Sequence, residues 1–305
     1  MKAKSILETL GKTPLVEISA KLNRTKARVF AKVESFNPGG SAKDRVAVAM
    51  IEAAEKSGAL APGGTVIEPT SGNTGVGLAL VSAVKGYRMI LVMPDNMSAE
   101  RIRLAKAYGA EVVLTPGADG MKGCIAKANE LHAAIPNSFI PQQFDNPANP
   151  AAHERTTGPE IWNDLDGQVD AFVVGVGTGG TLTGVGRFLK AKNPEVKLVA
   201  VEPETSPLLS KGTAGPHKLQ GIGANFVPSI LDRSLVDEIV CVSAENAGAT
   251  ARALGAQEGI LCGITSGAAL WAALELAQRD EFADKNIVTL LPDTGERYLS
   301  TWLFA

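Results

Sequence analysis

The feature that most constrains the fold is a regular alternation between short apolar runs and longer alanine-rich stretches. The runs VIEP, ILVMP, FVVGVG and VTLLP are apolar almost throughout, where a half-buried strand would alternate in polarity. Strands of this kind are covered on both faces, and strands that alternate with helices form parallel sheets. The sequence therefore predicts an α/β fold in two parts, with parallel-rich sheets flanked by helices and ligands at the carboxyl ends of the strands.

The predicted elements follow directly from these patterns. The strands are expected at Val29–Val33, Thr65–Glu68, Met89–Met93, Glu111–Leu114, Ala171–Gly175, Lys197–Glu202, Glu238–Val242 and Asn286–Leu291. The helices are expected at Ala42–Ser57, Gly75–Lys85, Ala99–Tyr108, Gly120–Ala134, Leu182–Ala191, Ala244–Gln257 and Gly267–Gln278.

Two segments are candidate domain boundaries. A chain of 305 residues has the length of two typical domains. The stretch PQQFDNPANP at Pro141–Pro150 is rich in proline and asparagine, which predicts neither regular helix nor central strand. The stretch NPGGS at Asn37–Ser41 is the second candidate.

Composition excludes several classes of partner. The chain is 45% hydrophobic and 20% charged with a formal net charge of −2, so it has no overall attraction for nucleic acid or an anionic membrane. No apolar run reaches the ~18 residues needed to span a bilayer. The amino terminus, MKAKSILETLGKTPLV, lacks the apolar stretch of a signal peptide. We expect a cytoplasmic protein.

Cysteine and histidine are sparse and scattered. The sequence has three of each and no CxxC pair, which argues against a disulfide framework or a structural metal site. Each is expected to be structural or incidental: Cys124, Cys241, Cys262, His132, His153 and His217.

The loop Asn37–Arg45 places a lysine at a helix start. Ser41 and Asp44 match the capping box S-x-x-D, which predicts Ser41 as the N-cap. Lys43 then lies in the first turn, where the positive end of the helix dipole lowers the pKa of its amine. A partly neutral amine is what a Schiff-base lysine requires. Taken alone, the pattern favours an ordinary solvated lysine on a capped helix.

The loop Glu68–Gly75 follows a predicted strand and precedes a helix. Its side chains offer hydroxyl and amide groups, and its glycines allow close approach to backbone N–H groups. Several neutral donors at a helix amino terminus form a seat for a carboxylate. By itself the loop is equally consistent with a polar turn that caps the helix.

The loop Gly175–Thr181 is glycine-rich and opens a helix, so it predicts a phosphate site. It also matches the dinucleotide pattern G-x-G-x-x-G at Gly175, Gly177 and Gly180, with Glu202 at the position of a ribose partner. The motif alone does not specify whose phosphate is bound. No Walker pattern is present.

The loop Cys262–Ala268 also opens a helix, and Thr265 and Ser266 offer hydroxyl groups in a setting of small residues. Taken alone it is best interpreted as an ordinary helix cap.

Taken together, these segments resemble the cysteine synthase (O-acetylserine sulfhydrylase) family, which has the tryptophan-synthase-β-like fold of pyridoxal-phosphate enzymes, fold type II. The motifs PGGSAKDR, TSGNTG, PQQFDNPANP, GTGGT and GITSGA occur in the family's order. The resemblance extends from Gly11-Lys-Thr-Pro-Leu15 to Gly295-Glu-Arg-Tyr-Leu-Ser-Thr301. It implies a homodimer, a smaller mobile domain at 40–146 and a larger domain at 1–39 and 147–305.

The resemblance assigns roles to individual residues. Lys43 corresponds to the lysine that holds pyridoxal 5'-phosphate, and Asn73 to the residue that hydrogen-bonds the ring hydroxyl. Thr265 stands where the family usually has a serine against the pyridine nitrogen. The phosphate cradle corresponds to Gly177, Thr178, Gly179, Gly180 and Thr181. The amino-acid carboxylate site corresponds to Thr70, Ser71, Asn73, Thr74 and Gln143.

The implied reaction is a β-replacement. O-acetyl-L-serine displaces Lys43 from the cofactor, and Lys43 removes the α-proton as general base. Acetate leaves, sulfide adds at the β-carbon, and L-cysteine is released with ping-pong kinetics. A neutral hydroxyl at Thr265 leaves the pyridine nitrogen unprotonated, which gives a weaker electron sink suited to β-elimination. Closure of the carboxylate loop would exclude water.

The choice of substrate and partner rests on finer features. The segment His217–Ala224 resembles forms that use O-acetylserine and sulfide, because forms that use O-phosphoserine or thiosulfate place basic residues there. Such enzymes commonly bind the carboxy-terminal tail of serine acetyltransferase, and the carboxylate loop is a candidate site for it.

The sequence departs from the family at Ala42, where valine is usual, and at Thr265. The chain shows neither a haem-binding extension nor a regulatory domain, which disfavours a full-length cystathionine β-synthase. Another donor or nucleophile, as in cystathionine or lanthionine formation, is the main alternative. A nicotinamide oxidoreductase built on GVGTGG leaves Lys43 and TSGNTG unexplained, and a non-catalytic binding protein leaves the filled chemical positions unexplained.

Overall fold

The computed structural model describes residues 2–97 and 99–304. The chain folds into two compact units. The small unit contains the residues up to Leu10 and Asn37–Asn149, and the large unit contains Gly11–Phe36 and the residues from Pro150 on. The structure thus groups the first residues with the small unit, because the short helix η1 (Ile6–Thr9) contacts α2 (Asn73–Lys85). Motion of the smaller domain stays a prediction.

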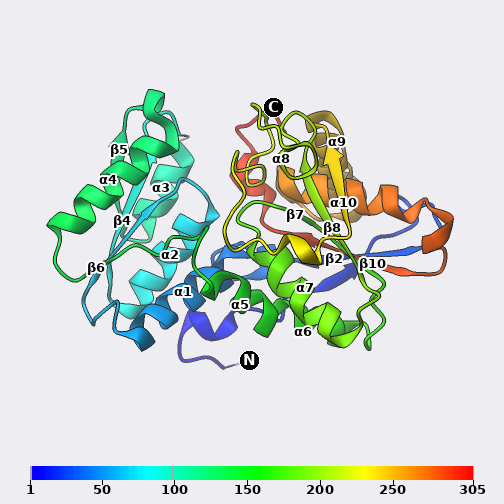
Figure 1. The fold of residues 1–305 in the computed structure, drawn as a ribbon, viewed down its shortest axis with the longest axis horizontal. Helices are drawn as coiled ribbons and strands as arrows, with labels where there is room; N and C mark the ends of the chain where they lie inside the picture. The colour runs from blue at the N-terminus through cyan, green and yellow to red at the C-terminus, as the bar shows by residue number, and fades with distance from the viewer. Residues whose placement is uncertain (1, 98, 305) are drawn as a thin grey trace. The chain divides into compact units, whose positions relative to one another are not determined.

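The large unit is built on a six-stranded sheet in the order β1-β2-β10-β7-β8-β9 (Figure 1). Its strand pairs are parallel except for β1, which is antiparallel to β2. Strands that connect through helices pair in this parallel way. The strands are β1 (Leu15–Glu17), β2 (Arg28–Val33), β7 (Ala171–Gly175), β8 (Lys197–Pro203), β9 (Glu238–Val242) and β10 (Asn286–Leu291).

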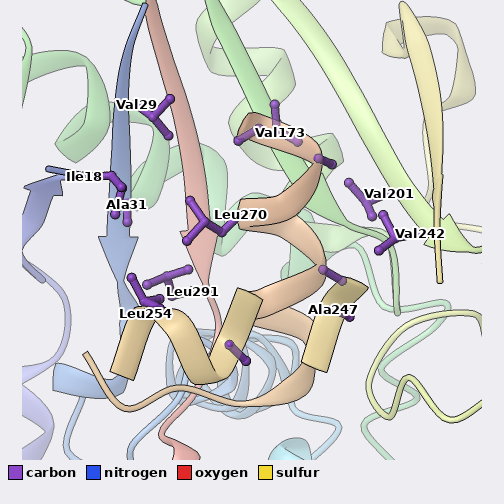
Figure 2. Packing of buried hydrophobic residues seen from close by; sticks show 14 of the residues in the cluster. Ile18, Val29, Ala31, Val173, Val201, Val242, Ala247, Leu254, Leu270 and Leu291 are labelled. Atoms are coloured by element: carbon purple, nitrogen blue, oxygen red, sulfur yellow. The ribbon is translucent and has the colours of Figure 1, made fainter. Parts of the chain in front are cut away.

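Helices α9 and α10 cover this sheet with an extensive apolar cluster. Figure 2 shows Val173 of β7, Leu254 of α9 and Leu270 of α10 among the side chains that meet there. A Cβ on Gly267 would lie 2.0 Å from the Ala247 carbonyl oxygen, so glycine is required for the close contact of the two helices. The helices of this unit are α5 (Ala148–Arg155, which begins in the small unit), α6 (Thr157–Asp164), α7 (Gly180–Lys192), α8 (Leu208–Lys211), α9 (Ala244–Glu258) and α10 (Ile264–Ala277).

The small unit is built on a four-stranded parallel sheet in the order β5-β4-β3-β6. On one face, Ile67 of β3 packs with Cys124 and Ala128 of α4, and the opposite face carries α1 and α2. The strands are β3 (Thr65–Pro69), β4 (Arg88–Pro94), β5 (Glu111–Thr115) and β6 (Ser138–Phe139). The helices are α1 (Lys43–Ser57), α2, α3 (Ala99–Ala107) and α4 (Gly120–Ala134).

The predicted α/β class is confirmed, and each predicted strand and helix is present within a few residues of its expected bounds. One local prediction is wrong. Pro141–Pro150 was expected to be irregular, but Ala148, Asn149 and Pro150 form the first turn of α5. Proline is tolerated there because the first-turn N–H groups have no intrahelical partner. Among the described residues, no helix has both the length and the apolarity to cross a bilayer.

Candidate active site

Lys43 is the first residue of α1 and is partly buried. The helix begins at Lys43 with Ala42 before it, one residue later than the predicted N-cap at Ser41 places its start, and Ala42 already has helical backbone angles. The Ser41 hydroxyl accepts a hydrogen bond from the Lys43 N–H at 3.3 Å, as a capping hydroxyl does. The Asp44 carboxylate accepts one from the Gly39 N–H at 2.7 Å. These bonds fix the turn so that Lys43 still lies at the positive end of the helix dipole.

The small unit brings Lys43 close to α2. A Cβ on Gly77 would lie 3.0 Å from the Lys43 carbonyl oxygen and 3.1 Å from the Ala47 Cβ. Gly77 therefore lets the first turns of α1 pack closely against α2, and α2 begins with the predicted carboxylate loop.

Hydrogen bonds hold the carboxylate loop at 70–74 in place at the start of α2. The Thr70 N–H donates to the Val92 carbonyl at 3.0 Å, and the Gly72 N–H donates to the Thr70 hydroxyl at 3.2 Å. Arg101 donates to the Ser71 carbonyl at 2.9 Å. Within the described residues no side chain caps α2. The first-turn N–H groups of such a helix can bind an anion.

Gln143 joins this loop from a segment about seventy residues away. The Thr74 hydroxyl, on the second residue of α2, donates to Gln143 Oε1 at 2.5 Å. Asn149 donates to the Gln143 carbonyl at 2.8 Å. The structure thus brings Thr70, Ser71, Asn73, Thr74 and Gln143 into one unit with Lys43.

Glu68 is a residue of this site that sequence reasoning missed. Its buried carboxylate accepts hydrogen bonds from the backbone N–H groups of Gln142, at 3.1 Å, and Gln143, at 3.3 Å. Burial raises the pKa of Glu68 to about 7, and the two N–H donors oppose that rise. The available signal was the charged residue inside the otherwise apolar run VIEP.

The predicted phosphate loop lies in the large unit between β7 and α7. Gly179 has φ +83°, in the left-handed region, and a Cβ there would lie 2.8 Å from the Leu231 Cβ. A Cβ on Gly177 would lie 2.2 Å from the Gly221 carbonyl oxygen. Gly179 is the N-cap of α7 and supplies no side-chain cap. The glycines therefore leave a backbone cradle at a helix amino terminus, as phosphate binding requires.

His153 supports this cradle, which is a structural role of the kind expected for it. It is fully buried on α5, and its Nε2 lies 3.2 Å from the Thr181 hydroxyl. Its Nδ1 lies 2.9 Å from the Thr157 hydroxyl. A Cβ on Gly184 would lie 2.1 Å from the Pro150 carbonyl oxygen, so Gly184 permits the close packing of α7 on α5 that brings His153 to Thr181.

Comparison with known proteins assigns the chain to a family. The family model of pyridoxal-phosphate dependent enzymes matches residues 6–293. The chain belongs to this family. It is 52% identical to a cysteine synthase of Staphylococcus aureus over 302 residues, which covers 99% of this chain and 97% of that protein.

Solved structures give the same fold. The structure of an O-ureido-L-serine synthase matches with a TM-score of 0.95 at 47% identity, over 100% of this chain and 96% of the other. A cysteine synthase of Entamoeba histolytica matches with a TM-score of 0.96 at 45% identity, over 100% of this chain and 91% of the other. The expected tryptophan-synthase-β-like fold of type II is confirmed.

The residues present fit pyridoxal phosphate. The cradle at 177–181 offers backbone N–H groups and two threonine hydroxyls, and a Cβ at either constrained glycine would collide with its surroundings. A primary amine for covalent attachment is present at Lys43, and an amide donor for the ring hydroxyl is present at Asn73.

Thr265 occupies an informative position in the large unit. Its hydroxyl donates to the Gln220 carbonyl at 2.7 Å, and its Cγ2 lies 3.0 Å from the position of a Cβ on Gly175. Thr265 therefore lies beside the start of the phosphate loop. To donate to a pyridine nitrogen, as the resemblance to the family implies, its hydroxyl has to exchange the bond to the Gln220 carbonyl.

Glu202 gives no support to the dinucleotide interpretation of GVGTGG. Its carboxylate accepts from the N–H groups of Leu209 and Ser210, at 2.7 and 3.0 Å, and from the Ser210 hydroxyl. It is 2% exposed and holds the start of α8. A ribose partner needs a carboxylate that faces the ligand.

The buried thiol of Cys262 is not a reactive nucleophile. Burial and the neighbouring Asp293 raise its pKa to about 12. A nucleophilic cysteine requires the opposite shift, because the thiolate is the reactive form.

Proposed function

We propose that the protein is a cysteine synthase that replaces the acetoxy group of O-acetyl-L-serine with sulfide to give L-cysteine and acetate. The observation that carries this proposal is the arrangement of the small unit, where the backbone of Lys43 at the start of α1 packs against α2, whose first residues offer hydroxyl, amide and backbone donors. An amine beside a carboxylate seat is what chemistry at the α-carbon of an amino acid requires. The 52% identity to a protein named cysteine synthase supports the same activity.

Lys43 has two roles in this proposal. Its Nζ would hold pyridoxal phosphate covalently, and the cofactor, once bound, supplies the electron sink for charge that develops at the α-carbon. Freed by the incoming amino acid, the same amine takes the proton from the α-carbon and returns it when the product has formed. Its position at the first residue of α1 disfavours the charged ammonium and so favours the basic form.

The carboxylate loop orients the amino acid. The first-turn N–H groups of α2, with Thr70, Ser71, Asn73 and Thr74, provide neutral donors for the carboxylate. The bond from Thr74 to Gln143 Oε1 leaves the amide group of Gln143 to serve as a donor. Neutral donors suit a zwitterionic substrate because they bind its carboxylate without repelling its ammonium group.

The phosphate loop anchors the cofactor in the large unit. Gly177, Gly179 and Gly180 give the phosphate access to the N–H groups at the start of α7. Thr178 and Thr181 add hydroxyl groups, and His153 orients that of Thr181. Asn73 and Thr265 are proposed to contact the ring.

A second candidate keeps the same β-replacement with a different nucleophile or donor. The observation that favours it is the 47% identity and TM-score of 0.95 to an O-ureido-L-serine synthase. Further candidates are O-phosphoserine as the donor, and thiosulfate, homocysteine or cysteine as the nucleophile.

Two features of assembly stay proposals. A homodimer rests on the resemblance to the family. Binding of the carboxy-terminal tail of serine acetyltransferase is supported by the carboxylate loop, because a peptide carboxylate presents the same group as the amino-acid substrate. O-acetyl-L-serine should then displace the tail.

The visible absorbance spectrum tests the function. The purified protein with pyridoxal phosphate is expected to absorb as a lysine-bound cofactor, to shift when O-acetyl-L-serine is added and to return when sulfide is added, with L-cysteine as product. A band that O-acetyl-L-serine does not move would transfer the proposal to another β-substituted amino acid. A protein that binds no pyridoxal phosphate would contradict the proposal altogether.

Rates with sulfide, hydroxyurea and homocysteine, measured with O-acetyl-L-serine in each case, separate the two candidates. The cysteine synthase proposal expects sulfide to give the highest kcat/KM.

A further inference from the structure

The hydrogen bonds of Glu68 connect two segments of the candidate substrate site. Glu68 is the fourth residue of β3 and stands two residues before Thr70. The two oxygens of its carboxylate each accept one backbone N–H, from Gln142 and from Gln143. One side chain thus ties the segment that carries Gln143 to the strand that leads into the carboxylate loop.

The segment needs this restraint because its backbone is strained. Gln142 has φ +56°, in the left-handed region that disfavours side chains other than glycine. The following turn is closed by the N–H groups of Asp145 and Asn146, which donate to the Gln142 carbonyl at 2.9 and 3.0 Å. Such a conformation persists only where its surroundings hold it, and the carboxylate of Glu68 supplies two of the contacts.

The charge of Glu68 is balanced by these N–H groups and not by a cation. Glu68 is 1% exposed, and within the described residues it forms no ion pair. Glu68 and Ile67 point to opposite faces of β3. Ile67 faces α4, and Glu68 lies on the face that packs on α2. The one charged residue of α2 is Lys85, at its far end, and Lys85 pairs with Glu55 at 2.8 Å.

The other titratable groups around this segment are also engaged elsewhere or uncoupled from Glu68. Arg101 of α3 donates to the Ser71 carbonyl, and Cys124 lies on the opposite face of the sheet with Thr115. Asp145 lies in the strained segment itself, and at the start of α1 the carboxylate of Asp44 binds the Gly39 N–H. No hydrogen bond or ion pair joins any of these four to Glu68 in the described part of the chain.

We propose that Glu68 is a positioning residue whose ionised carboxylate sets Gln143 against Thr74 and so controls the affinity of the site for the amino-acid carboxylate. The inference rests on the proposed function, because it requires Gln143 and Thr74 to bind substrate. The ionised carboxylate accepts both N–H groups, whereas the protonated form carries an O–H that competes with one of them. Loss of one bond releases the strained backbone and the Gln143 side chain that it places.

The proposed role predicts the direction in which the KM changes with pH. With a pKa of about 7, Glu68 is ionised above neutrality and protonated below it. The KM for the amino-acid substrate should therefore rise as pH falls through about 7, while kcat at saturating substrate changes little. A group that takes part in the chemistry would move kcat instead.

The test compares Glu68→Gln with wild type, with O-acetyl-L-serine varied at saturating sulfide between about pH 6 and pH 8. Glutamine keeps one acceptor and cannot ionise. In wild type the KM is expected to rise about fivefold from the higher to the lower pH. In E68Q it is expected to be about tenfold raised at the higher pH and to stay flat, with kcat within about threefold of wild type.

Two further variants make the result specific. Glu68→Asp keeps a titrating carboxylate with a shorter reach, so the acid rise in KM should return and the KM at high pH should fall between the other two. Glu202→Gln is the matched control, because Glu202 is an equally buried carboxylate that accepts two backbone N–H groups in the large unit. It should leave both KM and its pH dependence unchanged.

The outcomes separate this inference from the proposed function. A wild-type protein that makes no cysteine from O-acetyl-L-serine and sulfide contradicts the proposed function. If the wild type is active but the rise in KM at low pH persists in E68Q, the positioning role is contradicted. A KM in E68Q equal to that of wild type contradicts it as well. If E68Q does not fold, a KM in E68D equal to that of wild type overturns the inference.

Discussion

The carboxylate site and the phosphate cradle are built in opposite ways. The cradle in the large unit consists of backbone, and its shape depends on glycines that have no room for a Cβ. The carboxylate site in the small unit depends on side chains, and those are held by a hydrogen-bonded chain from Glu68 through Gln143 to Thr74. A site of the first kind is sensitive to volume. A site of the second kind is sensitive to polar groups and to pH.

The largest expected effect comes from adding one methyl group to the cradle. In Gly177→Ala the new Cβ would overlap the Gly221 carbonyl oxygen, which is backbone and cannot move without shifting the loop that also binds Thr265. We expect the affinity for pyridoxal phosphate to fall by about a hundredfold, equivalent to about 3 kcal/mol. Titration of cofactor-depleted protein, followed by absorbance, measures it.

Gly255→Ala is the matched control for this substitution. Gly255 lies in α9, and its nearest neighbours are 3.8 and 3.9 Å from the new Cβ. Alanine there should leave cofactor affinity unchanged and raise the unfolding midpoint slightly, because it favours the helix. Equal affinity in G177A and wild type would show that the cradle is not limited by volume.

The second effect is a change in stability with pH, and it arises from Glu68 in the small unit. The pKa of Glu68 is about 7 in the folded protein against an ordinary value of 4.5, so the folded state binds this proton more tightly than the unfolded state. The stabilisation by that proton is complete below about pH 4.5 and is lost as pH rises through about 7. At about 1.36 kcal/mol for each pKa unit, the complete loss amounts to roughly 3–4 kcal/mol.

Urea unfolding at about pH 5 and pH 8 measures this term as the difference between wild type and Glu68→Gln. The stability of wild type relative to E68Q should decrease at the higher pH. A relative stability that increases with pH would mean that the N–H groups of Gln142 and Gln143 lower the pKa of Glu68 more than burial raises it.

The difference between the two sites also explains what the sequence could predict. Gly177 and Gly179 mark the cradle in the sequence, because a backbone that admits no Cβ requires glycine. The strands were predicted closely because doubly covered strands leave continuous apolar runs. The roles of Lys43 and Asn73 came from the resemblance to a family, since local patterns at both loops had ordinary alternatives.

Residues that act over long sequence distances gave no local signal of their partners. Glu68 binds backbone groups 74 and 75 residues away, and His153 meets Thr181 across 28 residues. Helix α5 was missed because Asn149 and Pro150 lie in its first turn and Asn146 and Pro147 precede it. The capping-box pattern at Ser41 correctly indicated a hydroxyl that accepts a first-turn N–H, but it could not show that Asp44 accepts from the Gly39 N–H.

The third effect tests the hydrogen bond between Thr74 and Gln143 in the carboxylate site. Thr74→Val keeps the shape of the side chain but removes the donor to Gln143 Oε1. We expect the KM for O-acetyl-L-serine to rise about tenfold, because a buried amide oxygen loses its partner, while cofactor affinity stays that of wild type. A drop in cofactor affinity of the same size would show that the two sites are not independent.

The smallest effect comes from the support of the cradle. Thr157→Val removes the hydroxyl beside His153 Nδ1, and His153 in turn contacts the Thr181 hydroxyl. The backbone N–H groups at the start of α7 are untouched, so affinity for pyridoxal phosphate should fall only about threefold. Thr301→Val, which removes an equally local hydroxyl bond near the carboxyl terminus, should have no effect on the cofactor. If T157V instead lost as much affinity as G177A, the cradle would depend on its side chains as strongly as the carboxylate site does, and the contrast between the two sites would fail.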